Sequence, residues 1–398
     1  MKRLSKVMIE HRLAKIPPSY VEYLPEVRKF TDVEKLLRGG YHTLIFGITG
    51  SGKTTLLLKL LKVFLDRGLT ILARDDGGLE STFLLPYTPI TYWIPEGCKL
   101  RVRDSPYKYR VEGFDWRRPE EVLDSVWDSP FNLVVFDAYC IDPGVSAVFW
   151  SSMLKTLIFK CMQTPVSRKE KLVFSVDELN DLIQPKGYEL SKKHSDVRAL
   201  IEYNIRKLRK HNVTLVATTH RFTQLGISVR SQFSYVMVKK SFGWDVWDFV
   251  SKSLATQNNK VFWSVLKDIT VMSPEYAYLF DYKNNFDKFY VEDIQRPKLD
   301  VELQGVIQLE DEVQKYKERW LRLAWHMVNV GCPNCNYKYT QEKVANLSGV
   351  SQPALNQAFQ VWRRSASTRH TPQSHSLNGG DMWNGEEEGG EDRVASRS

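Results

Sequence analysis

The sequence predicts an α/β fold with a central, mostly parallel sheet, followed by a small helical domain. Short apolar runs alternate with helical periodicity from residue 42 to residue 217, the pattern of strands joined by crossover helices. A glycine-rich loop stands between the first of these strands and the first helix. Beyond residue 297 the strand pattern gives way to an amphipathic helical one.

The elements are predicted in the following order. A partly helical lead-in ends at the Gly39-Gly40 break. Apolar runs predict strands at residues 42–46, 69–74, 99–103, 132–136, 171–176 and 213–217. Helical periodicity predicts helices at residues 54–66, 147–161 and 195–210. Two further strands, at residues 276–280 and 288–291, flank a polar turn and predict a hairpin that closes the domain.

The domain boundaries follow from shifts in composition. Gln295-Arg296-Pro297 resembles a linker, and a long amphipathic helix is expected after it at 310–330. From residue 366 the chain is rich in Ser, Gly, Glu, His and Asn, with little to bury, which predicts disorder. We therefore expect four segments: a lead-in (1–40), an α/β domain (41–296), a helix-turn-helix domain (297–365) and a disordered tail (366–398).

The composition favours an anionic partner. The chain has 398 residues and a net charge of +9, and its last 33 residues hold six acidic and three basic side chains, so residues 1–365 carry +12. This balance favours nucleic acid first and membrane headgroups second, although a merely soluble basic protein fits it as well. Five cysteines, an odd count without a dense framework, fit a reducing intracellular setting.

No membrane insertion is expected. The sequence has no run of about 18 apolar residues, the length a spanning helix needs. The start is basic but has neither a long apolar core nor a small-residue cleavage site, so it does not resemble a signal peptide. We expect an intracellular, soluble protein.

The segment GITGSGKTT fits the Gly-x-x-x-x-Gly-Lys-Ser/Thr phosphate loop, with an apolar strand before it and a helix after it. Backbone N–H groups of such a loop wrap the β-phosphate, and the helix N-terminus adds partial positive charge. Lys53 would neutralise the β- and γ-phosphates, and the Thr54 hydroxyl would ligate Mg²⁺. The motif predicts a RecA-like P-loop domain that hydrolyses ATP with Mg²⁺. The expected nucleotide-binding residues are Gly47, Ile48, Thr49, Gly50, Ser51, Gly52, Lys53, Thr54 and Thr55.

Two apolar strands end in an acidic residue that could complete the Mg²⁺ site. One ends at Asp137, the other at Asp177-Glu178. Only the second carries paired acids, so we assign Asp177 to the metal and Glu178 to the activation of the attacking water. Asp137 is the rival, and a helix cap is the common role of an Asp after a strand.

The strand at 213–217 ends in Thr218, Thr219 and His220. In many P-loop motors this position senses the γ-phosphate, although threonines at a strand end also satisfy turns. On the preceding helix, Arg206 and Arg209 could reach the phosphate of a neighbouring subunit. Basic residues at a helix C-terminus also complement the helix dipole, so that alternative stays open.

The order of these parts resembles the FtsK–HerA superfamily of DNA-pumping ATPases over about residues 40–290. LTILARDDGGLE is similar to a second strand ending in an Asp-x-x-Gly turn, here Asp75 or Asp76, and LVFSVDELNDL to the acidic strand of that superfamily. LRKHNVTLVATTHR resembles an arginine-bearing helix end and a strand that finishes Thr-Gln-Arg, with His220 in place of the usual Gln. The resemblance implies a trans-acting Arg209, a sensor at Thr219 and His220, and a hexameric ring around duplex DNA.

The segment TQEKVANLSGVSQPALNQAFQVWRR fits a helix-turn-helix domain, which we expect to be of the winged kind. Thr340 is a plausible N-cap, Ala345 is small where the helices cross, and Leu355 falls on the buried face. The second helix would offer the following residues to double-stranded DNA: Ser351, Gln352, Asn356, Gln357, Arg363 and Arg364. A plain interaction domain is the alternative. Cys332 and Cys335 form half of a zinc knuckle, and no second pair accompanies them.

The leading hypothesis is an ATP-driven DNA translocase of a virus or mobile element, acting as a homo-oligomeric ring in packaging or DNA transfer. An alternative is an ATP-dependent switch that controls transcription or defence through the helix-turn-helix. A replicative helicase is a third interpretation. A pump predicts hydrolysis stimulated by duplex DNA, whereas a switch predicts slow turnover and binding to one operator.

Overall fold

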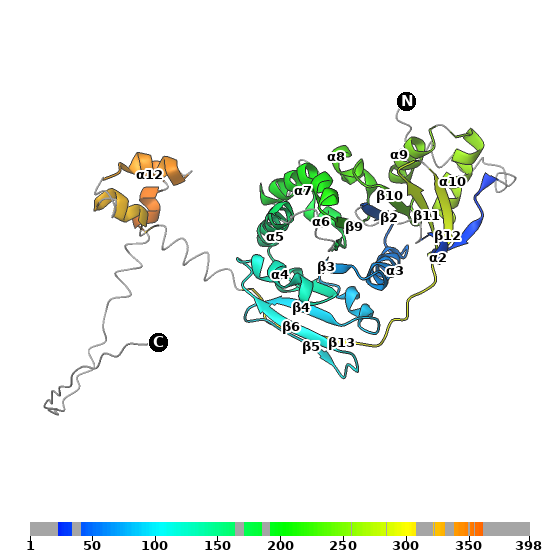
Figure 1. Ribbon diagram of the computed structural model, residues 1–398. Helices are drawn as coiled ribbons and strands as arrows, with labels where there is room; N and C mark the ends of the chain where they lie inside the picture. Colours follow the sequence, from blue (N-terminus) through cyan, green and yellow to red (C-terminus); the bar gives the residue numbers. More distant parts are fainter. Residues whose placement is uncertain are drawn as a thin grey trace, which may run out of the picture. The chain divides into compact units, whose positions relative to one another are not determined.

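The computed structural model describes residues 23–33, 41–163, 171–184, 192–255, 257–283, 285–307, 321, 323–330, 338–348, 351–353 and 355–360. The chain divides into two compact units, Met1–Ile307 and Gln308–Ser398. Figure 1 shows the labelled helices and strands.

The first unit is built on an 11-stranded sheet in the order β1-β12-β11-β10-β2-β9-β8-β3-β7-β4-β6. Only β11 runs antiparallel to its neighbours, so the fold class predicted from sequence, an α/β fold with a mostly parallel sheet, is confirmed. The strands are β1 Val27–Lys29, β2 Thr43–Phe46, β3 Thr70–Arg74, β4 Ile90–Pro95, β6 Tyr109–Phe114, β7 Phe131–Val134, β8 Leu172–Val176, β9 Val213–Thr219, β10 Tyr235–Val238, β11 Tyr276–Asp281 and β12 Phe286–Tyr290.

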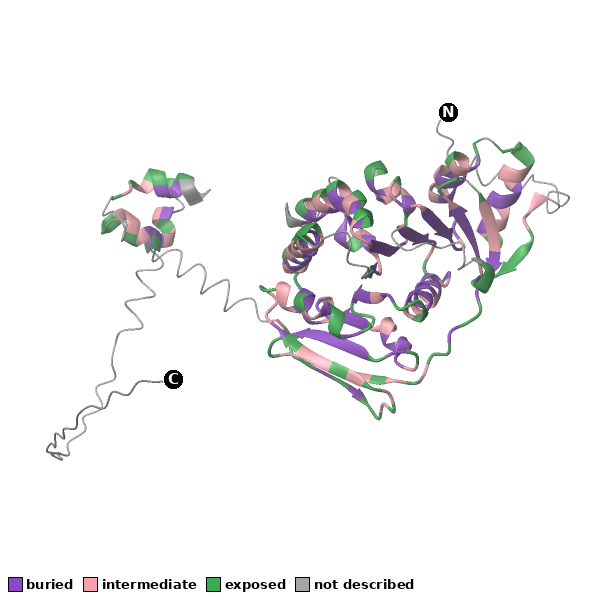
Figure 2. Ribbon diagram, in the orientation of Figure 1, coloured by how far each residue is buried: buried purple, intermediate pink, exposed green. Residues whose placement is uncertain are grey.

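Helices cover both faces of this sheet (Figure 1). The longer ones are α3 Lys53–Asp66, α5 Pro143–Gln163, α7 Lys192–Lys210, α9 Trp244–Ser253 and α10 Asn259–Val271. The shorter helices and 3-10 turns are α2 Phe30–Val33, η3 Glu80–Leu84, α4 Glu120–Asp124, η4 Val126–Asp128, η5 Asp137–Tyr139, α6 Leu179–Leu182, η6 Phe222–Gln224 and α8 Ile227–Arg230. One core cluster takes in the apolar residues of α3, the other those of α5, α7, α9 and α10. The central strands between them, β2, β3, β7, β8, β9 and β10, are buried (Figure 2), because a parallel sheet is apolar on both faces.

Helix α5 is long and apolar enough to cross a membrane by length and composition alone. Its side chains pack instead into the core of the first unit, where Phe149, Trp150 and Met153 are fully buried. We therefore describe α5 as a core helix. It also packs against α7.

The predicted hairpin is confirmed as β11 and β12, which pair antiparallel. The strand predicted at 99–103 is present as β5 Lys99–Arg103, but it lies outside the main sheet and pairs with β13 Asp300–Gln304. Because β13 pairs with β5, the first unit extends to Ile307. The domain boundary expected at residue 296 is therefore corrected to residue 307. The sequence pattern missed β4, β6, α9 and α10. Strands β4 and β6 lie in an irregular aromatic stretch, and α9 and α10 begin where the strand–helix alternation loosens.

The second unit is helical in the residues that the structure describes. Helix α12 Gln341–Ser348 begins after Thr340, whose hydroxyl accepts a hydrogen bond from Lys343 N, as predicted for an N-cap. Residues 323–329, 352–353 and 355–360 are also helical. A small core joins these helices through Ala324, Val344, Ala345, Leu355 and Phe359. No strand that could form a wing occurs among the described residues of this unit.

Candidate nucleotide-binding site

A cleft of about 630 Å³ lies at the edge of the sheet where the parallel strands end. This edge is where open α/β sheets bind ligands. The volume is within the range for small-molecule sites, which is about 300–1,000 Å³. The cleft is lined by Thr49, Gly50, Gly52, Lys53, Thr54, Thr55, Asp76, Glu80, Asp177, Glu178, His220, Pro274, Glu275, Tyr290, Val291, Asp293 and Arg296.

The phosphate loop joins β2 to α3, as predicted. Gly50 and Gly52 have φ of 74° and 83°, a left-handed conformation that glycine adopts without strain. A Cβ on Gly52 would also lie 3.1 Å from the carbonyl oxygen of Pro274. The backbone N–H of Ile48 donates to Lys240 O at 3.0 Å, so this amide faces away from the cleft.

Six of the nine predicted loop residues line the cleft: Thr49, Gly50, Gly52, Lys53, Thr54 and Thr55. Gly47, Ile48 and Ser51 do not line it. Gly47 is packed against the side chains of Ser51 and Lys239, and Ser51 is buried with its hydroxyl unpaired. A Cβ on Gly47 would lie within 3.0 Å of these neighbours, so this position of the loop requires glycine.

Lys53 lines the cleft, and its side chain is only 6% exposed. Its Nζ donates to His220 Nδ1 at 2.9 Å and lies 3.6 Å from Glu178 Oε1. The same Glu178 oxygen is 2.9 Å from His220 Nε2. Burial lowers the pKa of Lys53, while the Glu178 carboxylate opposes the shift. Lys53, His220 and Glu178 thus form a closed triangle of polar contacts beside the loop.

The acidic pair lies where β8 ends. Asp177 Oδ1 accepts hydrogen bonds from the Thr218 hydroxyl and from Glu178 N, and Glu178 N also donates to Thr218 Oγ1 at 2.9 Å. Glu178 has φ of 49°, a strained conformation for a residue with a side chain, and such strain concentrates at functional sites. Burial raises the pKa of Glu178 to about 7, and burial also raises the pKa of Asp177. Both residues line the cleft.

Asp137, the rival acid, does not line the cleft. Its carboxylate accepts hydrogen bonds from Ser146 Oγ, from Trp150 Nε1 and, at 2.8 Å, from Arg74 Nε. Arg74 NH1 in turn donates to the backbone oxygens of Asp177 and Glu178, at 3.0 and 3.4 Å. Asp137 is therefore a structural residue that holds a buried arginine beneath the acidic pair.

Thr219, the threonine expected as a sensor, does not line the cleft. Thr219 is buried and its hydroxyl contacts only the backbone of Arg221, at 3.3 and 3.4 Å, so it satisfies a turn. Thr218 touches the acidic pair instead. His220 lines the cleft as expected. Side chains alternate between the two faces of a strand. Neighbouring threonines at the end of β9 therefore point in opposite directions, and only Thr218 points toward the acidic pair.

Arg209 lies at the opposite edge of the sheet. It is in the last turn of α7, before the start of β9, and its guanidinium lies 5.4 Å over the ring of Tyr41. Strand β9 has seven residues and separates this edge from the cleft by roughly 23 Å at about 3.3 Å per residue. Arg209 therefore does not belong to the cleft of its own chain.

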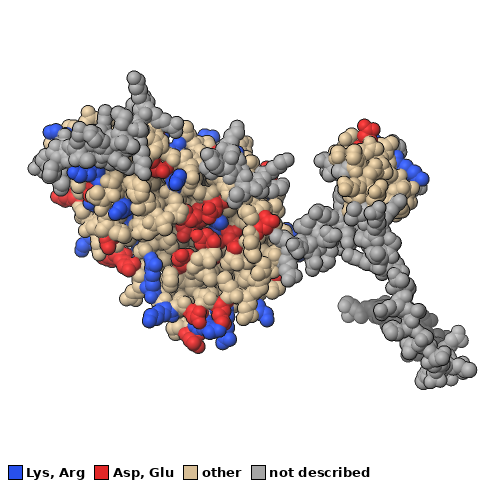
Figure 3. All heavy atoms as spheres, turned by 180° about the vertical axis from the view of Figure 1, so that it is seen from behind, with Lys and Arg blue, Asp and Glu red and all other residues tan. Residues whose placement is uncertain are grey.

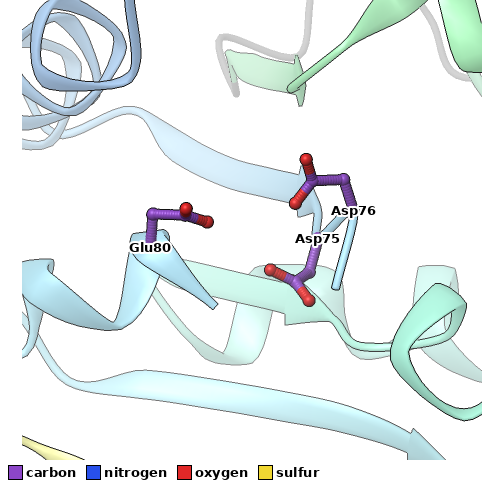
Figure 4. A group of neighbouring side chains, drawn as sticks. All are labelled: Asp75, Asp76 and Glu80. Atoms are coloured by element: carbon purple, nitrogen blue, oxygen red, sulfur yellow. The ribbon is translucent and has the colours of Figure 1, made fainter. Parts of the chain in front are cut away.

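The oxygen groups of the cleft fit a magnesium ion. Mg²⁺ binds through one or two carboxylates together with substrate phosphates, and Thr54 and Asp177 both line the cleft. Asp76 and Glu80 line the cleft as well. With Asp75 they form an acidic cluster at the end of β3, whose carboxylates face one another in Figure 4. Figure 3 shows one face of the first unit on which Asp and Glu gather.

Asp75 forms the predicted Asp-x-x-Gly turn. Its carboxylate accepts hydrogen bonds from Gly77 N at 3.0 Å and Leu79 N at 2.8 Å, while Asp76 accepts from Gly78 N. Burial, followed by the neighbouring charge of Asp76, raises the pKa of Asp75 to about 7. Asp75 shapes the turn, and Asp76 faces the cleft.

The sequence pattern missed one side of the cleft completely. Pro274 and Glu275 come from the turn before β11, Tyr290 is the last residue of β12, and Val291, Asp293 and Arg296 come from the segment after it. Arg296 had been placed in a linker because it precedes a proline. No local motif marks these residues, since they reach the cleft only through the pairing of β10, β11 and β12 beside β2.

The residues predicted to bind DNA lie in the second unit. Ser351, Gln352 and Gln357 are exposed and Asn356 is half-buried, as expected for the outward face of a helix. Arg363 and Arg364 lie outside the described residues, as do Cys332 and Cys335.

No protein-family model and no curated protein matches the chain in sequence. Among solved structures it is similar to the genome packaging NTPase B204 from Sulfolobus turreted icosahedral virus 2 in complex with ATP-gammaS, with a TM-score of 0.39 and 10% identity over 65% of this chain and 100% of that one. It is also similar to the plasmid coupling protein TrwB in complex with the ATP analogue ADPNP (TM-score 0.46, 13% identity, 68% and 94% covered). Likeness at this level carries no conclusion about activity, so function is inferred from the cleft.

Proposed function

We propose that the protein hydrolyses ATP in this cleft and uses the reaction to move double-stranded DNA through a ring of identical subunits. The observation that carries the ATPase is the triangle of Lys53, His220 and Glu178 beside a glycine loop, with Asp177 adjoining it. A loop that wraps phosphates, a cation for the β- and γ-phosphates and a carboxylate for the attacking water are the parts that phosphoryl transfer needs.

Each residue has a separate role in the proposed reaction. Lys53 would leave His220 and neutralise the β- and γ-phosphates. Thr54 and Asp177 would hold Mg²⁺, which neutralises charge on the phosphate oxygens when bound. Glu178 would orient the attacking water and accept its proton, and a pKa raised to about 7 suits a general base near neutral pH. His220, which contacts both Lys53 and Glu178, would sense the γ-phosphate through the lysine.

The proposed ring rests on the position of Arg209. In a ring, the edge of one subunit that carries Arg209 would face the cleft of the next, and a guanidinium there would stabilise the charge of the transition state. The resemblance in motif order implies six subunits. The net charge of +12 over residues 1–365 and the exposed polar residues of the helical unit support duplex DNA as the partner.

A regulatory switch is the second candidate, favoured by the exposed Gln352 and Gln357 on a helix suited to the major groove. The test measures ATP hydrolysis with and without long duplex DNA of random sequence, together with the native mass. A pump predicts severalfold stimulation and a ring; an unchanged rate with a monomer would rule the pump out. Slow turnover with tight binding to one operator would establish the switch, and strand separation would indicate a helicase.

A further inference from the structure

The cleft has two chemically different halves. One half holds the glycine loop, Lys53, Glu178 and His220. The other half is formed by Pro274, Glu275, Tyr290, Val291, Asp293 and Arg296. We propose that this second half is a nucleoside site, in which Tyr290 stacks on the purine base and Asp293 accepts a ribose hydroxyl. The proposal rests on the ATPase function proposed above.

The direction of the bound nucleotide follows from the loop. Lys53 and Glu178 mark the γ-phosphate end, because the lysine contacts the β- and γ-phosphates and the glutamate the attacking water. Thr55 lies in the first turn of α3, and its hydroxyl accepts a hydrogen bond from Arg296. The guanidinium of Arg296 lies 5.6 Å over the ring of Phe83, which fixes its place. The γ-phosphate would therefore lie near Glu178 and Lys53, and the α-phosphate near Thr55 and Arg296. The nucleoside, which is attached to the α-phosphate, would lie beyond Arg296.

The second half offers acceptors for hydroxyl groups. It has neither the glycine loop nor Lys53, and Glu275 and Asp293 line it, so it suits a hydroxyl-bearing group better than a phosphate. Asp293 Oδ1 accepts a hydrogen bond from Ile294 N at 3.0 Å, which leaves the second oxygen able to accept from a ribose hydroxyl. Arg296 is the cation of this half, at the point where the phosphates end.

The segment that carries these residues is fixed in place. Val291 N donates to Glu275 O at 2.6 Å, and the side chains of Val291 and Ile294 are each 3% exposed. Val291 also lines the cleft, together with Tyr290, Asp293 and Arg296 of the same segment. Tyr290 meets the ring of Tyr276 at 66° and is 40% exposed, so ring surface remains for a base. Aromatic side chains stack on any base, most extensively on purines.

The test compares the binding of ATP and of inorganic tripolyphosphate to the full chain by calorimetry, both with Mg²⁺. Wild-type protein should bind ATP more tightly than tripolyphosphate, because only ATP occupies the second half. Tyr290→Leu should weaken ATP binding about tenfold, within the range for losing one stacked base, and leave tripolyphosphate unchanged. Tyr290→Phe should keep wild-type affinity, and Tyr203→Leu, which changes a 71%-exposed tyrosine on α7, should alter neither ligand.

Equal affinity of the wild-type protein for the two ligands, or equal weakening of both in Tyr290→Leu, would overturn the proposal. Should Tyr290→Leu fail to fold, the fluorescence of etheno-ATP bound to wild-type protein decides the matter: stacking quenches it, and unquenched bound ligand would refute the stack. Lys53→Ala separates this proposal from the function it rests on. That variant should bind neither ligand. If it still binds tripolyphosphate, the phosphate site around Lys53, and with it the proposed ATPase function, would be contradicted.

Discussion

Strands β7 and β8 have the same sequence pattern, an apolar run that ends in an aspartate, yet their carboxylates have different roles. After β7, Asp137 is enclosed by Arg74, Ser146 and Trp150. After β8, Asp177 and Glu178 open into the cleft. Strand β3 lies between the two, and its last residue, Arg74, contacts both strand ends.

The comparison shows that the neighbouring strand decides the role of each acid. Asp137 meets a buried cation and is neutralised by it, with side-chain exposures of 11% and 4% for the acid and the arginine. Asp177 meets a neutral hydroxyl from Thr218, so its charge stays available for a metal. The buried ion pair of Arg74 and Asp137 at the end of β7 thus supports the acidic pair, Asp177 and Glu178, at the end of β8.

Glu178→Gln should have the largest effect on activity. The amide keeps the size of the side chain but cannot accept the proton of the attacking water, so turnover should fall by about 10²–10⁴-fold. ATP binding should be retained, because the glycine loop and Lys53 are unchanged. Single-turnover hydrolysis and equilibrium binding of ATP measure the two effects separately. Loss of ATP binding would instead make Asp177-Glu178 a structural pair like Asp137.

Asp177→Asn should have the next largest effect, and it should act through the metal. Removing the charge beside Thr54 should raise the Mg²⁺ concentration needed for half-maximal hydrolysis by about 10–100-fold, the range for a disturbed metal shell. A titration of Mg²⁺ at saturating ATP measures this shift. An unchanged Mg²⁺ requirement would indicate that the metal binds to the other acids of the cleft, Asp76 and Glu80.

The phosphate half of the site could be predicted from sequence because its chemistry is local. The glycine loop must lie between a strand and a helix, and an acidic pair must follow an apolar strand, so spacing alone located Lys53 and Glu178. Which of Thr218 and Thr219 faces the acids depends on strand register, which the sequence leaves open by one residue. Arg74 was not identified, because its role depends on β3 lying between β7 and β8.

The nucleoside half and the domain boundary could not be predicted, since both depend on contacts between distant segments. Arg296 precedes a proline and carries a linker signature, yet it contacts Thr55, 241 residues away. Residues 300–304 pair with β5, far earlier in the chain, and no local periodicity distinguishes this strand from the start of a helical domain. Strand order fixes both, and the sequence pattern contains no direct information about it.

Asp137→Asn should have the smallest effect on turnover and a distinct effect on stability. Asn keeps hydrogen-bonding capacity for Ser146 and Trp150 but leaves the buried Arg74 without its counter-charge, which should cost about 3–5 kcal/mol of unfolding free energy. Turnover per folded molecule should stay within about twofold, because this carboxylate does not face the cleft. Denaturant unfolding and active-site-normalised hydrolysis measure the two quantities, with Asp128→Asn, an exposed acid just before β7, as the matched control. A stable variant with greatly reduced turnover would show that Asp137 takes part in the chemistry, and the two strand ends would then be alike.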